Sequence, residues 1–311
     1  MARILVVGGT GLIGAGAALH LAEQGHDVTI AGRNPPAPGA LDRLAFAQGS
    51  YQTDDFDVAF LSRFDALVFA AANDVRQLPP NANEAAYFHQ ANSIAVPAFF
   101  ARARAAGIGR AVYVGSYYTA VLPRYRIEAS GYVASRKAAD DAVRAMASDS
   151  FHVCSLEAPF IMGHVEGVGA ISLEWSIRYL LGQMDSQPLW MIPGGGNFMS
   201  ILSFVEAVSG ALERGENGKA YLVGDENWLF AHYYELILDA LGRPQSLPVR
   251  DAEHPSMPDA TLYSGRNVIV AYEPEPESVR RLGYRRHDAE RAVRAMIPYY
   301  LARIGASEPG D

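Results

Sequence analysis

The sequence has little of three things: cysteine, clustered basic charge and long apolar runs. Cys154 is the single cysteine among 311 residues, which excludes a disulfide framework and a metal site built from thiolates. Lysine and arginine number 26 against 34 aspartate and glutamate, for a formal net charge of -8, so we expect no nucleic-acid partner. The longest fully apolar run, residues 66–72, is far shorter than the roughly 20 residues of a membrane span. We therefore expect a cytosolic protein without a membrane partner. The eight histidines show no ligand spacing with nearby acids, so no metal site is expected either.

Half of the residues are hydrophobic and 19% are charged, which is enough for a sizeable core. The first two-thirds of the chain alternates short apolar runs with helical stretches. Strands are expected over 3–7, 28–31, 66–72 and 111–114, and helices over 12–24 and 83–106. Such alternation predicts an α/β fold of the Rossmann type, a doubly wound parallel sheet covered on both faces.

The alternation weakens after about residue 160. Helices are still expected over 171–182, 205–213, 233–241 and 288–303, with a strand over 220–223. We therefore divide the chain into a dinucleotide-binding domain, residues 1–160, and a smaller substrate lobe, residues 161–311, which is partly interleaved with the first.

A glycine-rich turn follows the first expected strand and leads directly into a helix. It reads Gly8-Gly9-Thr10-Gly11-Leu12-Ile13-Gly14. Glycines in this context permit a tight turn and let backbone N–H groups approach a pyrophosphate at the helix N-terminus. We expect a dinucleotide to bind Gly8, Thr10, Gly11, Leu12, Ile13 and Gly14.

The end of the second strand bears on which dinucleotide binds. Many NAD sites carry an acid here for the ribose 2′-hydroxyl, whereas an arginine accommodates the 2′-phosphate of NADP. This chain has Gly32-Arg33-Asn34 at that place. We predict NADP, held by Arg33 and Asn34, with NAD as the alternative.

These features resemble the extended short-chain dehydrogenase/reductase superfamily, in the branch of dihydroflavonol-type reductases and sugar-nucleotide epimerases. The resemblance covers nearly the whole chain. It rests on the loop 8–14, on residues 65–72 as a strand beside the cofactor, on Asn92 in the next helix, on 110–116 ending in Ser116, on 156–163, and on Leu282-Gly283-Tyr284. By resemblance, Ala70, Ala71 and Pro159 also belong to the cofactor site.

The resemblance implies hydride transfer between a nicotinamide and a carbonyl or alcohol carbon. Ser116 would position the substrate oxygen and Tyr132 would exchange its proton. A free tyrosine titrates near pH 10, so this role requires a neighbouring cation. The family has a lysine four residues after the tyrosine, where this chain has Arg136.

Three interpretations of that departure stay open. Arg136 takes over the lysine's roles toward both tyrosine and cofactor, or the relay is abandoned and the protein binds cofactor without turnover. In the third, a helix irregularity brings Lys137 back, although one helical step turns it by about 100°. Tyr117 and Tyr118 also compete with Tyr132 as proton donor.

The second lobe bears on the substrate. No cation lies between Arg178 and Arg214, so a sugar-nucleotide diphosphate would be poorly held. The lobe offers Trp175, Tyr179, Trp190, Met191, Phe198 and Met199 for an apolar pocket. We predict an NADP-dependent reductase or dehydrogenase for a small, weakly charged, apolar or aromatic compound. The alternatives are a sugar-nucleotide epimerase or dehydratase, and a non-catalytic NADP-binding sensor or RNA-associated protein.

Alanine-rich helices at 83–106 and 132–147 predict a homodimer.

Overall fold

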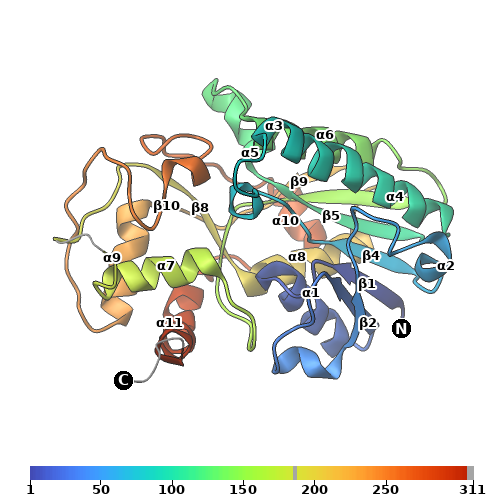
Figure 1. Ribbon diagram of the computed structural model, residues 1–311, viewed down its shortest axis with the longest axis horizontal. Coiled ribbons are helices and arrows are strands. Elements are labelled where there is room, and N and C mark those ends of the chain that lie inside the picture. The colour runs from blue at the N-terminus through green and yellow to red at the C-terminus, as the bar shows by residue number, and fades with distance from the viewer. Residues whose placement is uncertain (185–187, 307–311) are drawn as a thin grey trace.

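The computed structural model describes residues 1–184 and 188–306 (Figure 1). Within these ranges, seven parallel strands form the main sheet in the order β3-β2-β1-β4-β5-β6-β9. Their bounds are β1 Arg3–Val7, β2 Asp27–Gly32, β3 Ala45–Gln48, β4 Ala66–Phe69, β5 Arg110–Ser116, β6 His152–Ala158 and β9 Ala220–Leu222. This order confirms the Rossmann-type α/β fold, and its direction reverses between β1 and β4, where such folds bind ligands.

Both faces of the sheet are covered, which explains the continuous apolar character of the strands. Alternate residues of β1 point to opposite faces: Ile4 packs with α1 (Leu12–Glu23) and α8 (Ile201–Arg214), and Leu5 packs with α4 (Ala95–Ala105) and α6 (Gly131–Arg144). Figure 1 shows α4 and α6 on one side of the sheet and α1 and α8 on the other.

The second lobe is built around a small sheet with the order β10-β8-β7. Its strands are β7 Phe160–Met162, β8 Gly195–Ser200 and β10 Glu226–Leu229. The remaining α-helices are α2 Val58–Leu61, α3 Glu84–Phe88, α5 Tyr118–Val121, α7 Ile171–Leu180, α9 Phe230–Ala240, α10 Pro276–Leu282 and α11 Ala289–Ala306. Although α8 and β9 follow residue 160, α8 packs on α1 and β9 pairs with β6, so the chain returns to the main sheet.

Two expected elements differ in detail. The strand expected over 66–72 ends at Phe69, and residues 70–72 leave the sheet. The helix expected over 83–106 consists of α3, a π-helical segment His89–Ile94 and α4. Among the described residues, no helix is both long and apolar enough to cross a membrane.

Most of the apolar side chains that the sequence offered for a substrate pocket are core residues. Tyr179, Trp190, Met191 and Phe198 lie in the core of the second lobe, and Met199 lies in the core of the main sheet. Trp175 is 38% exposed on α7. Apolar side chains at helical and strand positions commonly form the core, which is the role the five buried residues have.

Candidate active site

A cavity of about 220 Å³ lies at the carboxyl ends of β1, β2 and β4. Six predicted cofactor residues line it: Gly8, Thr10, Gly11, Arg33, Ala70 and Ala71. Nine further residues do so as well: Val7, Ala31, Gly32, Gly49, Ser50, Tyr51, Gln52, Ala72 and Asn73. The sequence analysis missed residues 49–52 because they follow β3, a short strand with a weak apolar pattern. The strand order explains why residues 49–52 reach the cavity: β3 is parallel to β2, so both strands end at the same edge of the sheet.

The glycine loop has the shape that a pyrophosphate requires. Gly8 has a φ of +79°, and a Cβ there would lie 2.6 Å from the backbone nitrogen of Ala71. A Cβ on Gly11 would meet only the Gly8 carbonyl, at 3.6 Å, so Gly11 faces open space. No side chain caps α1. The amides of Leu12, Ile13 and Gly14 therefore have no carbonyl partner within the helix and suit an anion. The residues present fit a dinucleotide.

The end of β2 lines the cavity without a negative charge. Arg33 is exposed at its rim, and its carbonyl accepts a hydrogen bond from Nε2 of Gln48 at 3.1 Å. No aspartate or glutamate is among the described lining residues. Asn34 is exposed and, like Leu12, Ile13, Gly14 and Pro159, is not part of the lining. Pro159 is buried between β6 and β7.

Tyr132 and Arg136 lie one turn apart on α6, on the side that faces β5. The helix starts where Ser130 Oγ accepts the amide of Val133 at 3.3 Å. The Arg136 guanidinium donates from Nη1 to Tyr132 Oη at 3.1 Å. It also donates from Nε to Tyr113 Oη at 3.0 Å and from Nη2 to the Val114 carbonyl at 2.6 Å. Only 4% of Arg136 is exposed. Its three hydrogen bonds therefore hold a permanent positive charge at the Tyr132 hydroxyl.

The structure removes two of the competing interpretations. Lys137 points to solvent and pairs with Asp141 at 2.8 Å, so no helix irregularity returns it to Tyr132. Burial raises the pKa of Tyr117 well above its ordinary value and that of Tyr118 to about 12. Neither phenol has a guanidinium partner among the described residues, so both are poor acid–base groups near neutral pH.

Ser116 ends β5 beside this pair. It is 9% exposed, and its carbonyl accepts a hydrogen bond from Thr119 Oγ1 at 2.9 Å. Ser116 thus follows Val114, which anchors Arg136, by two residues of the same strand. The three predicted catalytic side chains come from β5 and α6, which pack against each other.

Aromatic rings surround Tyr132. Tyr263 stacks on it with 4.5 Å between ring centroids and 20° between planes, and Phe88 meets it edge-on at 5.5 Å. Tyr117, Tyr118 and Tyr272 belong to the same buried cluster, which Phe160 and Tyr263 extend at its edge. The sequence analysis did not single out Phe88, Phe160, Tyr263 or Tyr272, because they come from four separate segments.

Asn92 lies in the π-helical segment and ties two elements together. Its Nδ2 donates to the Asn73 carbonyl at 3.1 Å and to Ser135 Oγ at 3.0 Å. Its Oδ1 is buried and has no hydrogen-bond partner among the described residues. Because π-turns are frequent at functional sites, Asn92 is a candidate ligand-binding amide.

Glu157 is a buried acid that the sequence analysis also missed. It lies on β6 with 2% exposed, and its Oε2 is within hydrogen-bond distance of Thr119 Oγ1, at 2.7 Å. Burial, and secondarily the charge of Asp140, raise its pKa from 4.5 to about 7. A single carboxylic acid within the strand 152–158, between Leu156 and Ala158, was the available signal.

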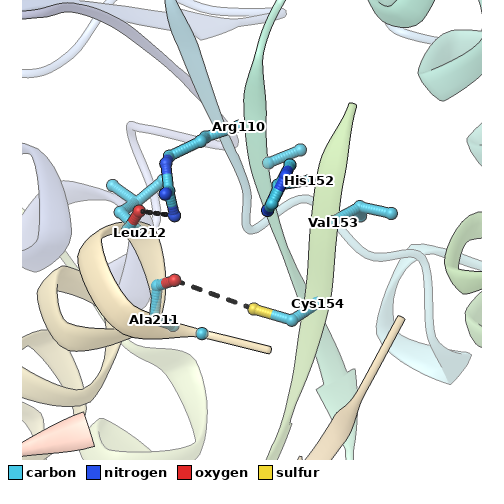
Figure 2. Close-up of a pocket in the computed structure, with 8 residues that line it drawn as sticks. Arg110, His152, Val153, Cys154, Ala211 and Leu212 are labelled. Atoms are coloured by element: carbon cyan, nitrogen blue, oxygen red, sulfur yellow. Dashed lines mark hydrogen bonds between the residues drawn. The ribbon is translucent and has the colours of Figure 1, made fainter. Parts of the chain in front are cut away.

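A second pocket lies at the opposite edge of the sheet, where β5 and β6 begin (Figure 2). Arg110, His152 and Cys154 line it, and it leaves no room for a water molecule. Sγ of Cys154 lies 3.9 Å from the Ala211 carbonyl, and burial raises the pKa of this thiol to about 12. Cys154 is therefore a packing residue and not a nucleophile.

Solved structures with the same fold cover nearly the whole chain. Gox2253 is 18% identical with a TM-score of 0.76, covering 98% of this chain and 99% of its own. A UDP-glucose-4-epimerase from Stenotrophomonas maltophila, solved with NAD and formylated UDP-arabinopyranose, is 15% identical with a TM-score of 0.76, covering 99% and 100%. The Bordetella bronchiseptica enzyme WbmH, solved with NAD+, is 16% identical with a TM-score of 0.70, covering 97% and 99%.

Among curated protein sequences, no significant relative is found. The model of one protein family matches residues 4–224, which is more than half of the chain. That range contains the glycine loop, Ser116, Tyr132 and Arg136. The chain belongs to the NAD dependent epimerase/dehydratase family.

Proposed function

We propose that this protein transfers a hydride between a nicotinamide cofactor and a carbonyl or alcohol carbon, with Tyr132 exchanging the hydroxyl proton. The observation that carries the proposal is the 3.1 Å hydrogen bond from Arg136 to the Tyr132 hydroxyl. A buried, permanent cation favours the phenolate over the phenol and so supports acid–base exchange. Ser116 is the candidate for orienting the substrate oxygen.

The nicotinamide would supply the hydride, while the chain binds and orients both partners. The amides at the start of α1 would hold the pyrophosphate. Arg33, at a rim without carboxylates, supports NADP over NAD, because a guanidinium binds a phosphate in bidentate fashion. NAD stays the alternative, and it is the cofactor named in the structures of WbmH and the Stenotrophomonas epimerase.

Two substrate classes compete. The aromatic rings around Tyr132 support a small, weakly charged, apolar or aromatic compound. The family and the sugar-nucleotide enzymes of the same fold support a sugar-nucleotide epimerase or dehydratase, and these comparisons favour that second candidate over the first. Both candidates use hydride transfer and a tyrosine acid–base.

One experiment separates the candidates. NADPH and NADH oxidation is followed with aldehydes, cyclic ketones and aryl ketones, while UDP-sugars are incubated with the protein and analysed for epimers and keto products. Turnover of a ketone with NADPH supports the reductase. A UDP-sugar product, together with NAD retained through purification, supports the epimerase or dehydratase. Cofactor binding without either product would leave a sensor or an RNA-associated role.

We also propose a homodimer, as the alanine-rich helices suggest. Small exposed side chains occur on both helices: Ala98 and Ala101 on α4, and Ala134 and Ala138 on α6. Light scattering coupled to size exclusion tests this proposal, and Ala138→Arg is expected to give monomers.

A further inference from the structure

The proposed chemistry leaves one buried acid without a role. Glu157 lies on the sheet face covered by α6, the face that Val153 of the same strand also occupies. A Cβ on Gly115 would lie 2.6 Å from Glu157 Oε1, so the carboxyl group occupies the space that a side chain at residue 115 would need. Oε1 itself has no hydrogen-bond partner among the described residues.

The Thr119 hydroxyl stands between this carboxyl and the strand end that carries Ser116. Thr119 Oγ1 lies 2.9 Å from the Ser116 carbonyl and 2.7 Å from Glu157 Oε2. A hydroxyl has one proton to donate, and a carbonyl can only accept. When Thr119 donates to Ser116, Glu157 must therefore carry a proton and donate to Thr119. When Glu157 is ionised, Thr119 turns its proton to the carboxylate and releases the Ser116 carbonyl.

Charged and titratable groups on α6, on β5 and in the C-terminal segment face Glu157. They are Arg136, Asp140 and Arg144 on α6, Tyr113 on β5 and Tyr272 in the C-terminal segment. Asp140 is 4% exposed, and its Oδ1, like Oε1 of Glu157, is unpartnered within the described residues. Because Arg136 and Glu157 are both buried, they interact through a medium of low polarity, where charge effects persist over longer distances.

We propose that Glu157 is a positioning residue for Ser116, Tyr132 and Arg136: its carboxyl sets the end of β5 through Thr119, and its ionised form offsets the charge that Arg136 places on Tyr132. This inference rests on the proposed function. Burial and Asp140 hold the pKa of Glu157 near 7, so the switch between its two hydrogen-bonding arrangements falls close to neutral pH.

The test uses two readouts that need no turnover. The first is the infrared C=O stretch of protonated carboxyl groups in the wild-type protein and in Glu157→Gln, followed over pH. The second is the ultraviolet absorbance of phenolate, taken as the difference between proteins with and without Tyr132→Phe, in the wild-type and Glu157→Gln backgrounds. Asp141→Asn is the matched control, because it changes a half-exposed carboxylate of α6, the helix that carries Tyr132 and Arg136, to an amide.

The expected result has two parts. A carboxyl signal titrates near pH 7 in the wild type and in Asp141→Asn, and it is missing in Glu157→Gln. In Glu157→Gln, more Tyr132 phenolate is expected at a fixed alkaline pH, since the charge of Glu157 no longer offsets that of Arg136. Once a substrate is known, the neutral inflection of the kcat/KM profile is expected to disappear in Glu157→Gln.

Either of two results would overturn the inference. The wild-type carboxyl signal could show no titration near neutrality, or the Tyr132 phenolate could form over the same pH range in both backgrounds. The second result would reduce Glu157 to a packing residue. Because both readouts are spectroscopic, they decide the role of Glu157 separately from the outcome of the turnover assays.

Discussion

Arg136 donates from Nη1 to the Tyr132 hydroxyl across one turn of α6, at 3.1 Å. The other two nitrogens of the guanidinium bind Tyr113 and the Val114 carbonyl on β5. Arg136 is thus anchored in the protein by three hydrogen bonds. Its charge reaches the tyrosine directly, and its orientation is set by the strand that carries Ser116.

Removing the Tyr132 hydroxyl is expected to abolish turnover without disturbing the cofactor cavity. Tyr132→Phe keeps the ring that stacks on Tyr263 but has no proton to exchange, so kcat is expected to fall by about 10²–10⁴-fold. Steady-state kinetics and NADPH titration by tryptophan fluorescence measure the two quantities. A loss of cofactor affinity equal to the loss of kcat would mean that the hydroxyl has a structural role.

Arg136→Lys and Arg136→Gln separate the charge from the hydrogen bonds. A lysine ammonium cannot reach Tyr113, Tyr132 and Val114 together, so the free energy of unfolding is expected to fall by about 1–3 kcal/mol in Arg136→Lys. Turnover is expected to fall roughly tenfold in Arg136→Lys and a hundredfold or more in Arg136→Gln, which lacks the cation. Urea unfolding and kinetics check both values. Equal activity losses in the two variants would show that the charge is not what matters.

Arg33→Ala tests the cofactor preference. Loss of a bidentate phosphate contact at an exposed rim is expected to weaken NADPH binding by about 1.5–3 kcal/mol, or roughly ten- to a hundredfold. NADH has no 2′-phosphate, so its Kd is expected to stay within about twofold of the wild-type value, as titration of both cofactors would show. If both cofactors weaken together, Arg33 does not discriminate between them, and NAD becomes the better assignment.

The ring of Tyr263 is expected to contribute to substrate binding. Because an aromatic pair contributes about 0.5–1.5 kcal/mol beyond buried area, Tyr263→Ala is expected to raise KM for an aryl ketone by roughly three- to tenfold. Tyr263→Phe is the matched control, since the Tyr263 hydroxyl has no hydrogen-bond partner within the described part of the chain. Similar KM values in all three proteins would contradict an aromatic substrate pocket beside Tyr132.

Glu157 makes stability depend on pH in an unusual direction. Its pKa is raised from 4.5 to about 7 in the folded protein, so between these values the folded chain keeps a proton that the unfolded chain has lost. The free energy of unfolding therefore falls as pH rises through this window, by up to about 1.4 kcal/mol per pH unit, and the loss is complete above it. Urea unfolding of wild type and Glu157→Gln at several pH values measures the difference.

Asp140→Asn tests whether this pH dependence of the free energy of unfolding comes from Glu157. Removing the Asp140 charge is expected to lower the pKa of Glu157 and to move the pH-dependent window downward, because that charge is, after burial, the second cause that raises the pKa. Asp141→Asn should leave the window in place. A slope unchanged in Glu157→Gln would assign the pH dependence to another group.

Local sequence patterns were enough to predict most of the architecture. The apolar strands, the glycine loop before α1 and the alanine-rich helices are properties of neighbouring residues, so they predicted the parallel sheet and the place of Gly8, Thr10 and Gly11 at the cavity. Ser116, Tyr132 and Arg136 were proposed from the family resemblance, and their catalytic roles stay a prediction. The local pattern predicted a strand longer than β4, which ends at Phe69, because the apolar run continues past the point where strand pairing stops.

The surroundings of these residues were decided only by tertiary structure. Which way Arg136 points depends on acceptors on β5, and the stacking of Tyr263 on Tyr132 joins segments more than a hundred residues apart. Phe198 and Met199 lie in the core and Tyr263 stacks on Tyr132, although their residue types alone fit either place. Periodicity along the chain fixes which face a residue occupies within its element. What meets that face is set by long-range packing, and the chemistry of this site depends on those contacts.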